Sequence, residues 1–436
     1  MWAQSASLKR LPLPPAVVIT HCGLENFKGF RKLDIDLRSV NVFIGPNGSG
    51  KSSVGQSLLL LKQSPGGGMN LGGPYLRAND FRDIQRIGSE SNLVQIALIG
   101  SIETRELGVS KDFMEEVARF EAEFAFERGQ VRRSRTEIRV KGTTLAAQWD
   151  RYEGTKPNTL NFQNVQVAYQ GTQEVGLTMQ VVSTSTIGTV PPEKYAWVQN
   201  QVQALMQAGR VILSRIYYVP PVRGLENPSL PLPGGPSVDL LEQGTQQYPA
   251  TVLATLAYRR KEFQPRIAAW TDRVLGRKVS AEIIPGPQIE ARAAEGDKEI
   301  NILAEGFGLN QLTFLFTQIL SALPSSTIII EEPEIHLHPM AQYELGALLV
   351  EIALREGKQF IFTTHSEHFL FGVLSKVHTE KGFTNKDLSV YSFERKDSVA
   401  SAQALTVTVD GKIQEGLPGF FEVNLQELQE TLAKRD

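Results

Sequence analysis

A glycine-rich segment near the start of the chain has the residue types and spacing of a phosphate-binding loop. Residues 45–52 read GPNGSGKS, which fits the pattern G-x-x-x-x-G-K-[ST]. The glycines let backbone N–H groups turn inward around a phosphate. Lys51 is expected to reach the β- and γ-phosphates of a nucleotide, and the Ser52 hydroxyl is expected to ligate Mg²⁺. We therefore predict a site for ATP and Mg²⁺ with the contact residues Asn47, Gly48, Ser49, Gly50, Lys51, Ser52 and Ser53.

Two adjacent carboxylates follow an apolar run far along the chain. Residues 327–330 read TIII and are followed by Glu331 and Glu332. The run predicts a buried parallel strand, which delivers both carboxylates to its C-terminal end, where ligands bind in open α/β sheets. There Glu331 is expected to hold Mg²⁺ through water, and Glu332 to polarise the attacking water as a general base.

A histidine ends the next apolar run. Residues 360–364 read FIFTT and are followed by His365. The run predicts the strand beside the acidic one, so that a neutral His365 imidazole can hydrogen-bond the leaving phosphate and the attacking water. His336 and His338 could also be metal ligands, but the chain has one cysteine and no matching acidic–histidine set. We expect these two histidines to pack in a turn or an interface.

Two glycines and an amide stand where a further helix is expected to begin. Gly306, Gly308 and Asn310 open a segment that reads as helix to about Ala322. Such a start is either an anion-binding helix N-terminus or an ordinary helix cap. The segment lies one helix before the acidic strand.

Short strand patterns and helices alternate around these residues. The acidic run and the histidine run belong to an alternation of strand, helix, strand and helix, which predicts a parallel sheet with crossover helices. The period of two at 120–126, the turn at Gly129 and the return at 131–140 predict a β-hairpin. Further strands are expected at 17–20, 33–37, 40–44, 93–102, 160–169, 177–182 and 216–219, and helices at 51–62, 193–208, 238–275, 340–355 and 368–375.

The chain is divided here into three parts. Residues 16–190 are expected to form the N-terminal part of one large domain, 191–290 an inserted, mainly helical module, and 291–436 the C-terminal part of the same domain. A loop rich in proline and glycine at 220–236 lies within the middle part.

Composition places the chain among globular proteins. Its 436 residues are 41% hydrophobic and 21% charged, and the formal net charge is −2. The single cysteine, Cys22, excludes an internal disulfide framework. The first residues read as neither a signal peptide nor an anchor, and the apolar runs are far shorter than a membrane span. A cytoplasmic protein without a membrane partner is therefore expected.

Four sequence blocks together resemble a known group of proteins. The blocks are LENFKGF at 24–30, the glycine-rich loop, EEPEIHLHP at 331–339 and TTHS at 363–366. They are similar to those of ABC-type ATPase heads of the RecF, SMC and OLD group. The resemblance is closest to stand-alone bacterial AAA-type ATPases, through YVPPVRG at 218–224 and a C-terminal tail that begins with DGKI at 410–413. No motif between about 102 and 216 could be matched.

This resemblance implies an α/β fold and a set of roles. The fold is an ABC ATPase head with a mixed sheet, a P-loop core and an antiparallel β portion, plus an inserted strand-and-helix module. Lys51 and Ser52 become the P-loop pair, Glu332 the catalytic base and His365 the switch histidine.

The resemblance also implies that two copies of the chain share each site. Gly306, Gly308 and Asn310 become the signature that contacts the ATP of a partner copy, so a homodimer or higher oligomer is expected. Gln85 is a candidate Q-loop residue. Arg223 either lines the nucleotide or dimer face or forms a structural ion pair.

Three biological settings remain open. The resemblance favours the ATPase subunit of a bacterial anti-phage defence system, as in Septu- or PARIS-like pairs, acting with a separately encoded effector. A fused nuclease is not expected, because 71 residues follow His365 and no glutamate followed by D-x-D occurs in them. A RecF-like DNA-binding repair ATPase is the alternative, and nucleic acid could bind a basic strand with Arg132, Arg133, Arg135, Arg139 and Lys141. The nucleotide domain of a transporter is least favoured.

Overall fold

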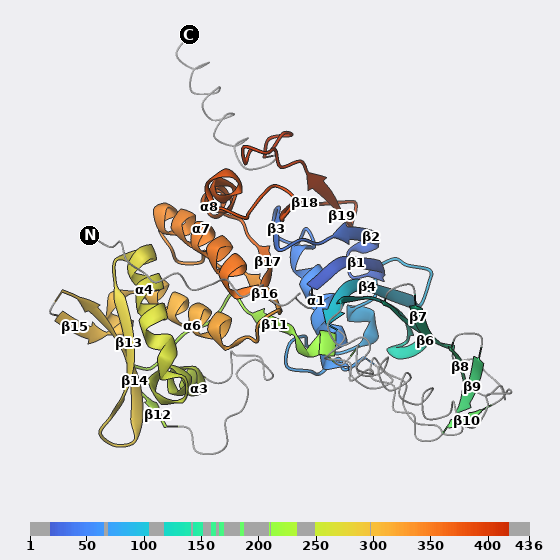
Figure 1. Cartoon of the computed structure of the whole chain (residues 1–436), viewed down its shortest axis with the longest axis horizontal. Coiled ribbons are helices and arrows are strands. Elements are labelled where there is room, and N and C mark those ends of the chain that lie inside the picture. Colours follow the sequence, from blue (N-terminus) through green and yellow to red (C-terminus); the bar gives the residue numbers. More distant parts are fainter. Residues whose placement is uncertain are drawn as a thin grey trace, which may run out of the picture.

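A twelve-stranded mixed sheet connects the N-terminal and C-terminal parts of the chain (Figure 1). The computed structural model describes residues 18–64, 69–103, 117–140, 143–150, 158–162, 165–169, 184–186, 209, 211–232, 249–296 and 298–417. Beyond residue 129, the strands up to residue 186 are described by their backbone, with the side chain of Glu137 in addition. The sheet order is β11-β16-β17-β3-β18-β19-β2-β1-β4-β5-β6-β7.

The first five strands in this order pair in parallel. They are β11 (Ile216–Val219), β16 (Thr327–Glu331), β17 (Gln359–Thr363), β3 (Val40–Ile44) and β18 (Leu388–Lys396). All five residues of β3 and of β17 are buried, as expected for strands covered on both faces. The predicted parallel sheet with crossover helices is confirmed.

Helices cover both faces of this parallel part. Phe43 packs with α1 (Lys51–Gln63) in one apolar core, whereas its neighbours Val42 and Ile44 pack in the other. That second core contains α6 (Phe307–Ser321), α7 (Pro339–Glu356) and α8 (Glu367–Thr379). Successive side chains of a strand point to opposite faces of the sheet, so each strand packs in both cores. The loops that follow the parallel strands lie at their carboxyl ends, where such sheets bind ligands.

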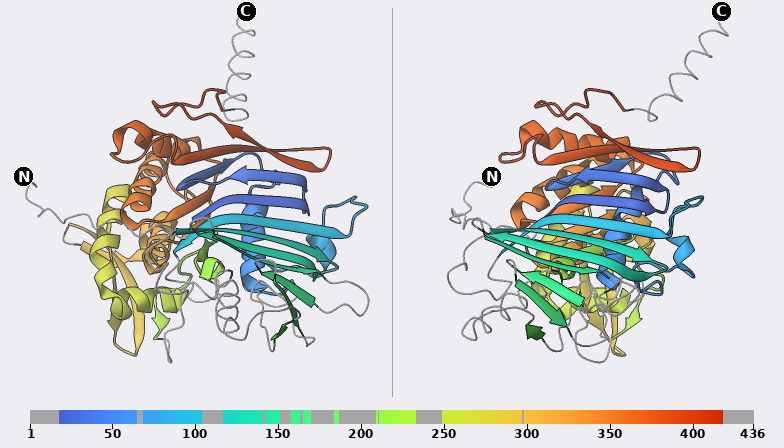
Figure 2. Two further views of the ribbon diagram at one scale, coloured as in Figure 1. Left: turned by 45° about the vertical axis from the view of Figure 1, so that its right-hand side comes forward. Right: turned by 90° about the vertical axis from the view of Figure 1, so that its right-hand side faces the viewer.

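The other strands form the antiparallel portion, which Figure 2 shows as a series of neighbouring bands. β19 (Val399–Leu405) returns antiparallel to β18 and meets β2 (Phe30–Asp36) in a parallel contact, at the pair Ala400 and Phe30. The strands that follow are β1 (Val18–Phe27), β4 (Leu93–Glu103), β5 (Val117–Glu127), β6 (Gln130–Val140) and β7 (Thr143–Asp150). The predicted hairpin is confirmed as β5 and β6, which are joined at Arg128 and Gly129, both with positive φ.

A smaller antiparallel sheet lies beside this portion. It consists of β8 (Asn158–Phe162), β9 (Val165–Tyr169) and β10 (Thr184–Thr186). The strand predicted at 160–169 is therefore two strands of a hairpin. The strand predicted at 177–182 and the helix predicted at 193–208 lie outside the described residues.

The middle of the chain contributes strands to two sheets. β11 is an edge strand of the main sheet, next to β16. A second sheet is formed by β12 (Leu230–Pro231), β13 (Lys278–Ile284), β14 (Gln288–Glu295) and β15 (Lys298–Asn301). The segment 191–290, predicted as mainly helical, is thus of mixed composition where it is described. Its boundaries stay a prediction.

The long helix predicted at 238–275 is interrupted. Its described part contains α3 (Pro249–Ala254), a π-helical turn at Thr255–Arg259, a 3₁₀ turn at Lys261–Phe263 and α4 (Gln264–Leu275). Proline lacks the N–H that would continue a helix, and Pro265 stands in the first turn of α4, where that N–H is not needed. The break therefore has a local cause.

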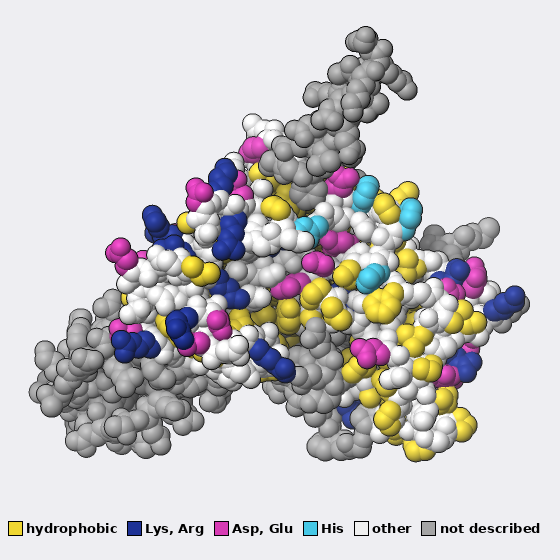
Figure 3. All heavy atoms as spheres, turned by 180° about the vertical axis from the view of Figure 1, so that it is seen from behind, with side chains coloured by type: hydrophobic (Ala, Val, Ile, Leu, Met, Phe, Trp, Pro, Cys, Tyr) yellow, Lys and Arg dark blue, Asp and Glu magenta, His cyan; other side chains and the backbone are white. Residues whose placement is uncertain are grey.

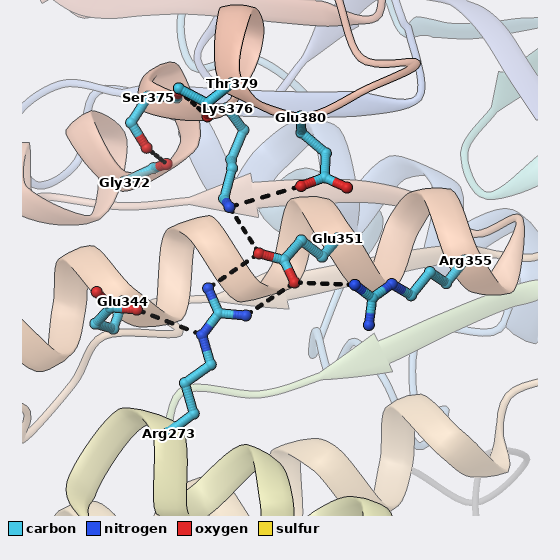
Figure 4. Close-up of polar contacts among 9 residues, drawn as sticks. All are labelled: Arg273, Glu344, Glu351, Arg355, Gly372, Ser375, Lys376, Thr379 and Glu380. Carbon is cyan, nitrogen blue, oxygen red and sulfur yellow. Dashed lines mark hydrogen bonds and ion pairs between the residues drawn. The ribbon is translucent and has the colours of Figure 1, made fainter. Parts of the chain in front are cut away.

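An ion-pair network ties α4 to α7 and α8 (Figure 4). Arg273 of α4 donates from Nη1 and Nη2 to the Glu351 carboxylate of α7 at 2.8 and 3.0 Å. Lys376 of α8 approaches the same carboxylate to 2.7 Å. Burial opposes ionisation of Glu351, but the hydrogen bonds from Arg273 and Lys376 outweigh it and lower its pKa to about 2. The middle of the chain is thereby fastened to the two helices that follow the acidic strand and the histidine strand.

Candidate nucleotide-binding site

The glycine-rich loop connects β3 to α1 in a conformation that requires glycine at two positions. Gly45 has a φ of 141°, and a Cβ atom there would lie 2.2 Å from the carbonyl oxygen of Phe393. Gly50 has a φ of 107°, and its Cβ would lie 2.8 Å from the ring of Phe30. Both φ values lie in a region that side chains rarely adopt. The loop therefore packs closely against the hairpin of β18 and β19 and against the start of β2.

Lys51 lies at the centre of the site. Its Nζ donates to the carbonyl oxygens of Gly45 and Pro46 at 2.8 and 2.9 Å. Burial lowers the pKa of Lys51 to about 8, against the opposing effect of the carboxylates of Glu332, Glu331 and Glu334. The structure thus brings the predicted lysine and both predicted carboxylates together.

Glu331 and Ser52 are paired as the predicted metal-binding residues. The Ser52 hydroxyl hydrogen-bonds the Glu331 carboxylate, and burial raises the pKa of Glu331. The Oε1 atom of Glu331 is buried and has no hydrogen-bond partner, and the same is true of Oγ of Ser49 in the loop. Buried polar atoms normally have partners, so these two atoms fit a bound cation and a phosphate.

Glu332 occupies a strained turn at the end of β16. Its φ is 46°, which is uncommon for a residue other than glycine. Its backbone N–H donates to the carbonyl oxygen of Thr363, the last residue of β17, at 2.9 Å. The turn places the Glu332 carboxylate where its charge raises the pKa of both Lys51 and His365.

His365 follows β17 and interacts electrostatically with Lys51 and Glu332. Burial and the charge of Lys51 lower its pKa, and Glu332 opposes this effect. A lowered pKa keeps the imidazole neutral near pH 7, as expected for a hydrogen-bonding partner of phosphate and water. The predicted adjacency of the histidine strand and the acidic strand is confirmed by the parallel pairing of β16 and β17.

Glu334 connects the turn that follows β16 with the loop that follows β17, and this role was not predicted. Its Oε1 accepts from the Thr364 hydroxyl at 2.5 Å and from the His365 backbone N–H at 3.1 Å. Burial raises the pKa of Glu334, whose side chain is 6% exposed. The block EEPE contained this glutamate, but only its first two carboxylates were assigned chemistry.

Arg223 was left with two alternatives, and the structure places it in neither. It is buried, and its guanidinium donates to main-chain carbonyl oxygens of the turn that contains Glu332. Sequence reasoning missed this arrangement, although the block YVPPVRG already singled out the residue. Lys28, in the β1–β2 turn, was also missed: it donates to Gln56 at 2.5 Å and is electrostatically coupled to Glu331.

The predicted signature residues have different environments. Gly306 is exposed with a φ of 118° and precedes α6, while Gly308 lies against Leu337 and the carbonyl oxygen of His336. Asn310 is fully buried, and its amide exchanges two hydrogen bonds of 2.9 Å with the backbone of Leu225. The prediction that Asn310 contacts a partner's ATP is therefore corrected, because its side chain is engaged inside its own chain.

The other predicted residues lie around this centre. The Gln85 side chain donates to the carbonyl oxygen of Ser91 in its own loop at 2.5 Å. Its role as a Q-loop residue stays a prediction. His338 caps α7 through Met340 N–H at 3.4 Å, and the His336 ring packs edge-on against Phe307 with centroids 4.9 Å apart.

The surface around the histidines has a mixed character. On the face opposite to that of Figure 1, histidine and acidic side chains lie close together among hydrophobic ones (Figure 3). Within the described residues, no group of three or more histidine, cysteine, aspartate or glutamate side chains could hold a metal ion. In the same part of the chain, no helix is long and apolar enough to cross a membrane.

A known family matches most of this region. The family described as "AAA domain, putative AbiEii toxin, Type IV TA system" matches residues 40–370, which include the loop, the acidic strand and His365. The chain belongs to this family of AAA domains. As an AAA domain, it is a nucleotide-binding ATPase by family. No curated protein matches this chain.

Solved structures of SMC heads are similar to this AAA domain at low identity. An SMC head bound to the C-winged helix domain of ScpA is 14% identical with a TM-score of 0.49, covering 89% of this chain and 98% of that chain. The SMC head domain from Thermotoga maritima is 12% identical with a TM-score of 0.42 and the same coverage. An SMC head with an extended coiled coil, derived from Pyrococcus furiosus, is 13% identical with a TM-score of 0.45, covering 95% and 99%.

Proposed function

We propose that the chain hydrolyses ATP in a site built around Lys51, Glu332 and His365 and completed by a second copy. The observation that carries this proposal is the meeting of the three residues at the carboxyl ends of neighbouring parallel strands. Each residue follows a different strand, and the carboxyl end of a parallel sheet is where such folds bind ligands.

Each residue of this group has a distinct part in the proposed reaction. Backbone N–H groups of residues 47–53 surround the β- and γ-phosphates, and Lys51 neutralises their charge. Ser52 and Glu331 hold Mg²⁺, which when bound neutralises charge that develops on the phosphates. Glu332 orients the attacking water and accepts its proton. A neutral His365 donates a hydrogen bond to the γ-phosphate.

A second copy would complete the site through the start of α6. Gly306 is exposed there, and Phe307 beside it is 48% exposed although it is a large apolar residue. The first N–H groups of α6 form a positive helix end that suits a phosphate of a facing copy. ATP would thus hold two copies together, and its hydrolysis would release them.

The biological setting that we propose is an ATPase or sensor subunit of an anti-phage defence system with a separately encoded effector. The family description, which names a putative toxin of a type IV toxin–antitoxin system, supports such a paired arrangement. A RecF-like DNA-repair ATPase is the second candidate. DNA binding that weakens steeply with salt would favour it over the first.

Substitution of the proposed base tests the reaction. Glu332→Gln keeps the shape of the side chain but removes its ability to accept a proton, so turnover should fall by about 10²–10⁴-fold. ATP turnover and mass in solution should be measured with and without ATP. The variant should accumulate as an ATP-dependent dimer, because bound ATP is no longer consumed.

The control is Glu299→Gln, which makes the same chemical change at an exposed position of β15. It should leave turnover and mass unchanged. If Glu332→Gln turns over ATP at the rate of the unaltered protein, Glu332 is not the base. If mass ignores nucleotide in both proteins, the shared site is wrong.

A further inference from the structure

Arg223 is a buried cation whose donors are used by the main chain. Nη1 donates to the carbonyl oxygens of Pro220 at 2.8 Å and Glu331 at 3.3 Å. Nη2 donates to the carbonyl oxygens of Glu332 at 3.3 Å and Pro333 at 3.1 Å. Arg223 is 5% exposed, and its Nε is buried without a hydrogen-bond partner. Both Nη groups are therefore used by the main chain, and Nε, the remaining donor, is enclosed by the chain itself.

The three consecutive carbonyl groups that it binds lie at the end of β16 and in the strained turn that follows it. Glu331 is the last residue of the strand, and the positive φ of Glu332 turns the chain away, so Glu332 and Pro333 lie beyond the strand. A buried carbonyl group needs a donor. The planar fork of arginine can supply several donors in fixed directions, which a lysine cannot.

Burying a charged guanidinium costs free energy, so the filling of space alone does not explain why Arg223 is buried. Burial lowers the pKa of Arg223 to about 10, and the carboxylates of Glu334 and Glu332 oppose this effect. An apolar side chain could fill the same space without this cost. The carbonyl groups of Glu331 and Pro333, however, would then lose the donors that Arg223 supplies, and that of Glu332 would keep only the Ile335 N–H at 3.2 Å.

The loop that carries Arg223 also holds the start of α6. Two residues later, Leu225 exchanges two backbone hydrogen bonds with the Asn310 amide. Gly224 between them has a φ of 123°, and a Cβ there would lie 2.9 Å from the Asn310 amide. Residues 223–225 thus connect the turn of the proposed base to the helix whose start would face a second copy.

From these contacts we propose that Arg223 is a positioning residue, which orients Glu332 for proton abstraction by holding the carbonyl groups of residues 331–333. It does not touch the nucleotide. This inference rests on the proposed function, because it assigns to Arg223 an effect that acts only through Glu332. It predicts a loss of turnover without a matching loss of nucleotide affinity.

A double-mutant cycle tests the inference. The variants are Arg223→Lys, Glu332→Gln and the two combined, with Arg223→Gln as a second substitution. Arg223→Lys should lower kcat by about 10–100-fold, the scale of a small misplacement of a reacting group, and change the Kd of ATP by less than about twofold. In the Glu332→Gln background, single-turnover rates should fall by less than about twofold further, because a residue that acts through Glu332 has nothing left to position.

A matched control separates positioning from stability. Lys358 is another buried cation, 4% exposed, that donates to a main-chain carbonyl group, that of Ile319 in α6. Lys358→Met should lower the unfolding temperature and leave kcat unchanged. Thermal unfolding of every variant shows which ones are folded, and Arg223→Lys serves if Arg223→Gln does not fold.

Two failures would be distinguishable. If Glu332→Gln retains full turnover, the proposed function fails. If Glu332→Gln is inactive but Arg223→Lys lowers the rate by the same factor in both backgrounds, or weakens ATP binding as much as kcat, Arg223 does not act through Glu332 and this inference is overturned.

Discussion

Lys51 and Glu331 show how environment rather than residue type prepares the site. Burial lowers the pKa of the lysine and raises that of the carboxylate, so each loses some of its preference for the charged form. A bound phosphate and a cation would restore both charges. Such opposed shifts among neighbouring residues are typical of functional sites.

The sequence predicted these two residues because their motifs carry the chemistry locally. Lys51 follows a glycine-rich loop, and Glu331 ends an apolar run. The role of Arg223 could not be predicted in this way, because the carbonyl groups that it binds in the turn are 108–110 positions away in the chain. The prediction that Asn310 contacts a partner's ATP was wrong for a related reason, because the burial of Asn310 against Leu225 depends on the tertiary fold.

Nucleotide affinity should depend on Lys51 and on pH together. Lys51→Met should weaken the binding of ADP by about 10–100-fold, because a charge-assisted hydrogen bond is lost. A bound phosphate favours protonated Lys51, whose pKa is about 8, so affinity should be highest below pH 8 and fall as pH rises through it. Calorimetric titration between pH 7.5 and 9 measures both effects.

The control for this experiment is again a buried lysine. Burial also lowers the pKa of Lys358 to about 8, but Lys358 lies directly before β17, at the opposite end of that strand from His365. Lys358→Met should therefore leave affinity and its pH dependence intact. An unchanged pH dependence in Lys51→Met would show that another group titrates.

At the scale of elements, apolar runs predicted the strands but not their order. Three strands were recognised as nearly continuous apolar runs, because both of their faces are buried: residues 40–44, 327–330 and 359–363. The contact of β19 with β2 could not be predicted, because it is given by one pair, Ala400 and Phe30. Pairing over long distances in sequence leaves no local pattern.

The ion-pair network predicts a stability effect at this scale. Glu351→Gln should lower the free energy of unfolding by about 1–3 kcal/mol at pH 7, because Arg273 and Lys376 lose their shared charged hydrogen-bond acceptor. The pKa of Glu351 is lowered from 4.5 to about 2, so its stabilising contribution is complete above about pH 4.5 and is lost as pH falls towards 2. Urea denaturation at pH 7, 5 and 4 measures this dependence, which should be weaker in the variant.

Glu344→Gln is the matched control on the same helix. Glu344 is 38% exposed and meets Arg273 at 3.4 Å, so its loss should cost less than about 0.5 kcal/mol. Equal effects of the two substitutions would mean that the network of Figure 4 adds nothing to stability beyond a surface ion pair.

At the scale of the whole molecule, α6 has two exposed apolar ends with different expected roles. Phe307 stands at its start, beside Gly306 and against His336, while Leu323 follows its end. The two side chains are 48% and 47% exposed. Only the start of the helix lies on the side of the turn that follows β16, since Gly308 contacts that turn at Leu337 and His336.

This difference allows the shared site to be tested without disturbing the residues around the phosphate loop. In the Glu332→Gln background, Phe307→Asp should abolish the ATP-dependent dimer, because it places a charge where an apolar ring and a positive helix end would meet a second copy. Leu323→Asp makes the same change at an equally exposed apolar position and should leave the dimer intact. Light scattering with ATP measures the mass, and a titration confirms that each variant still binds ATP as a monomer. A dimer that survives Phe307→Asp but not Leu323→Asp would place the contact between copies at the other end of α6.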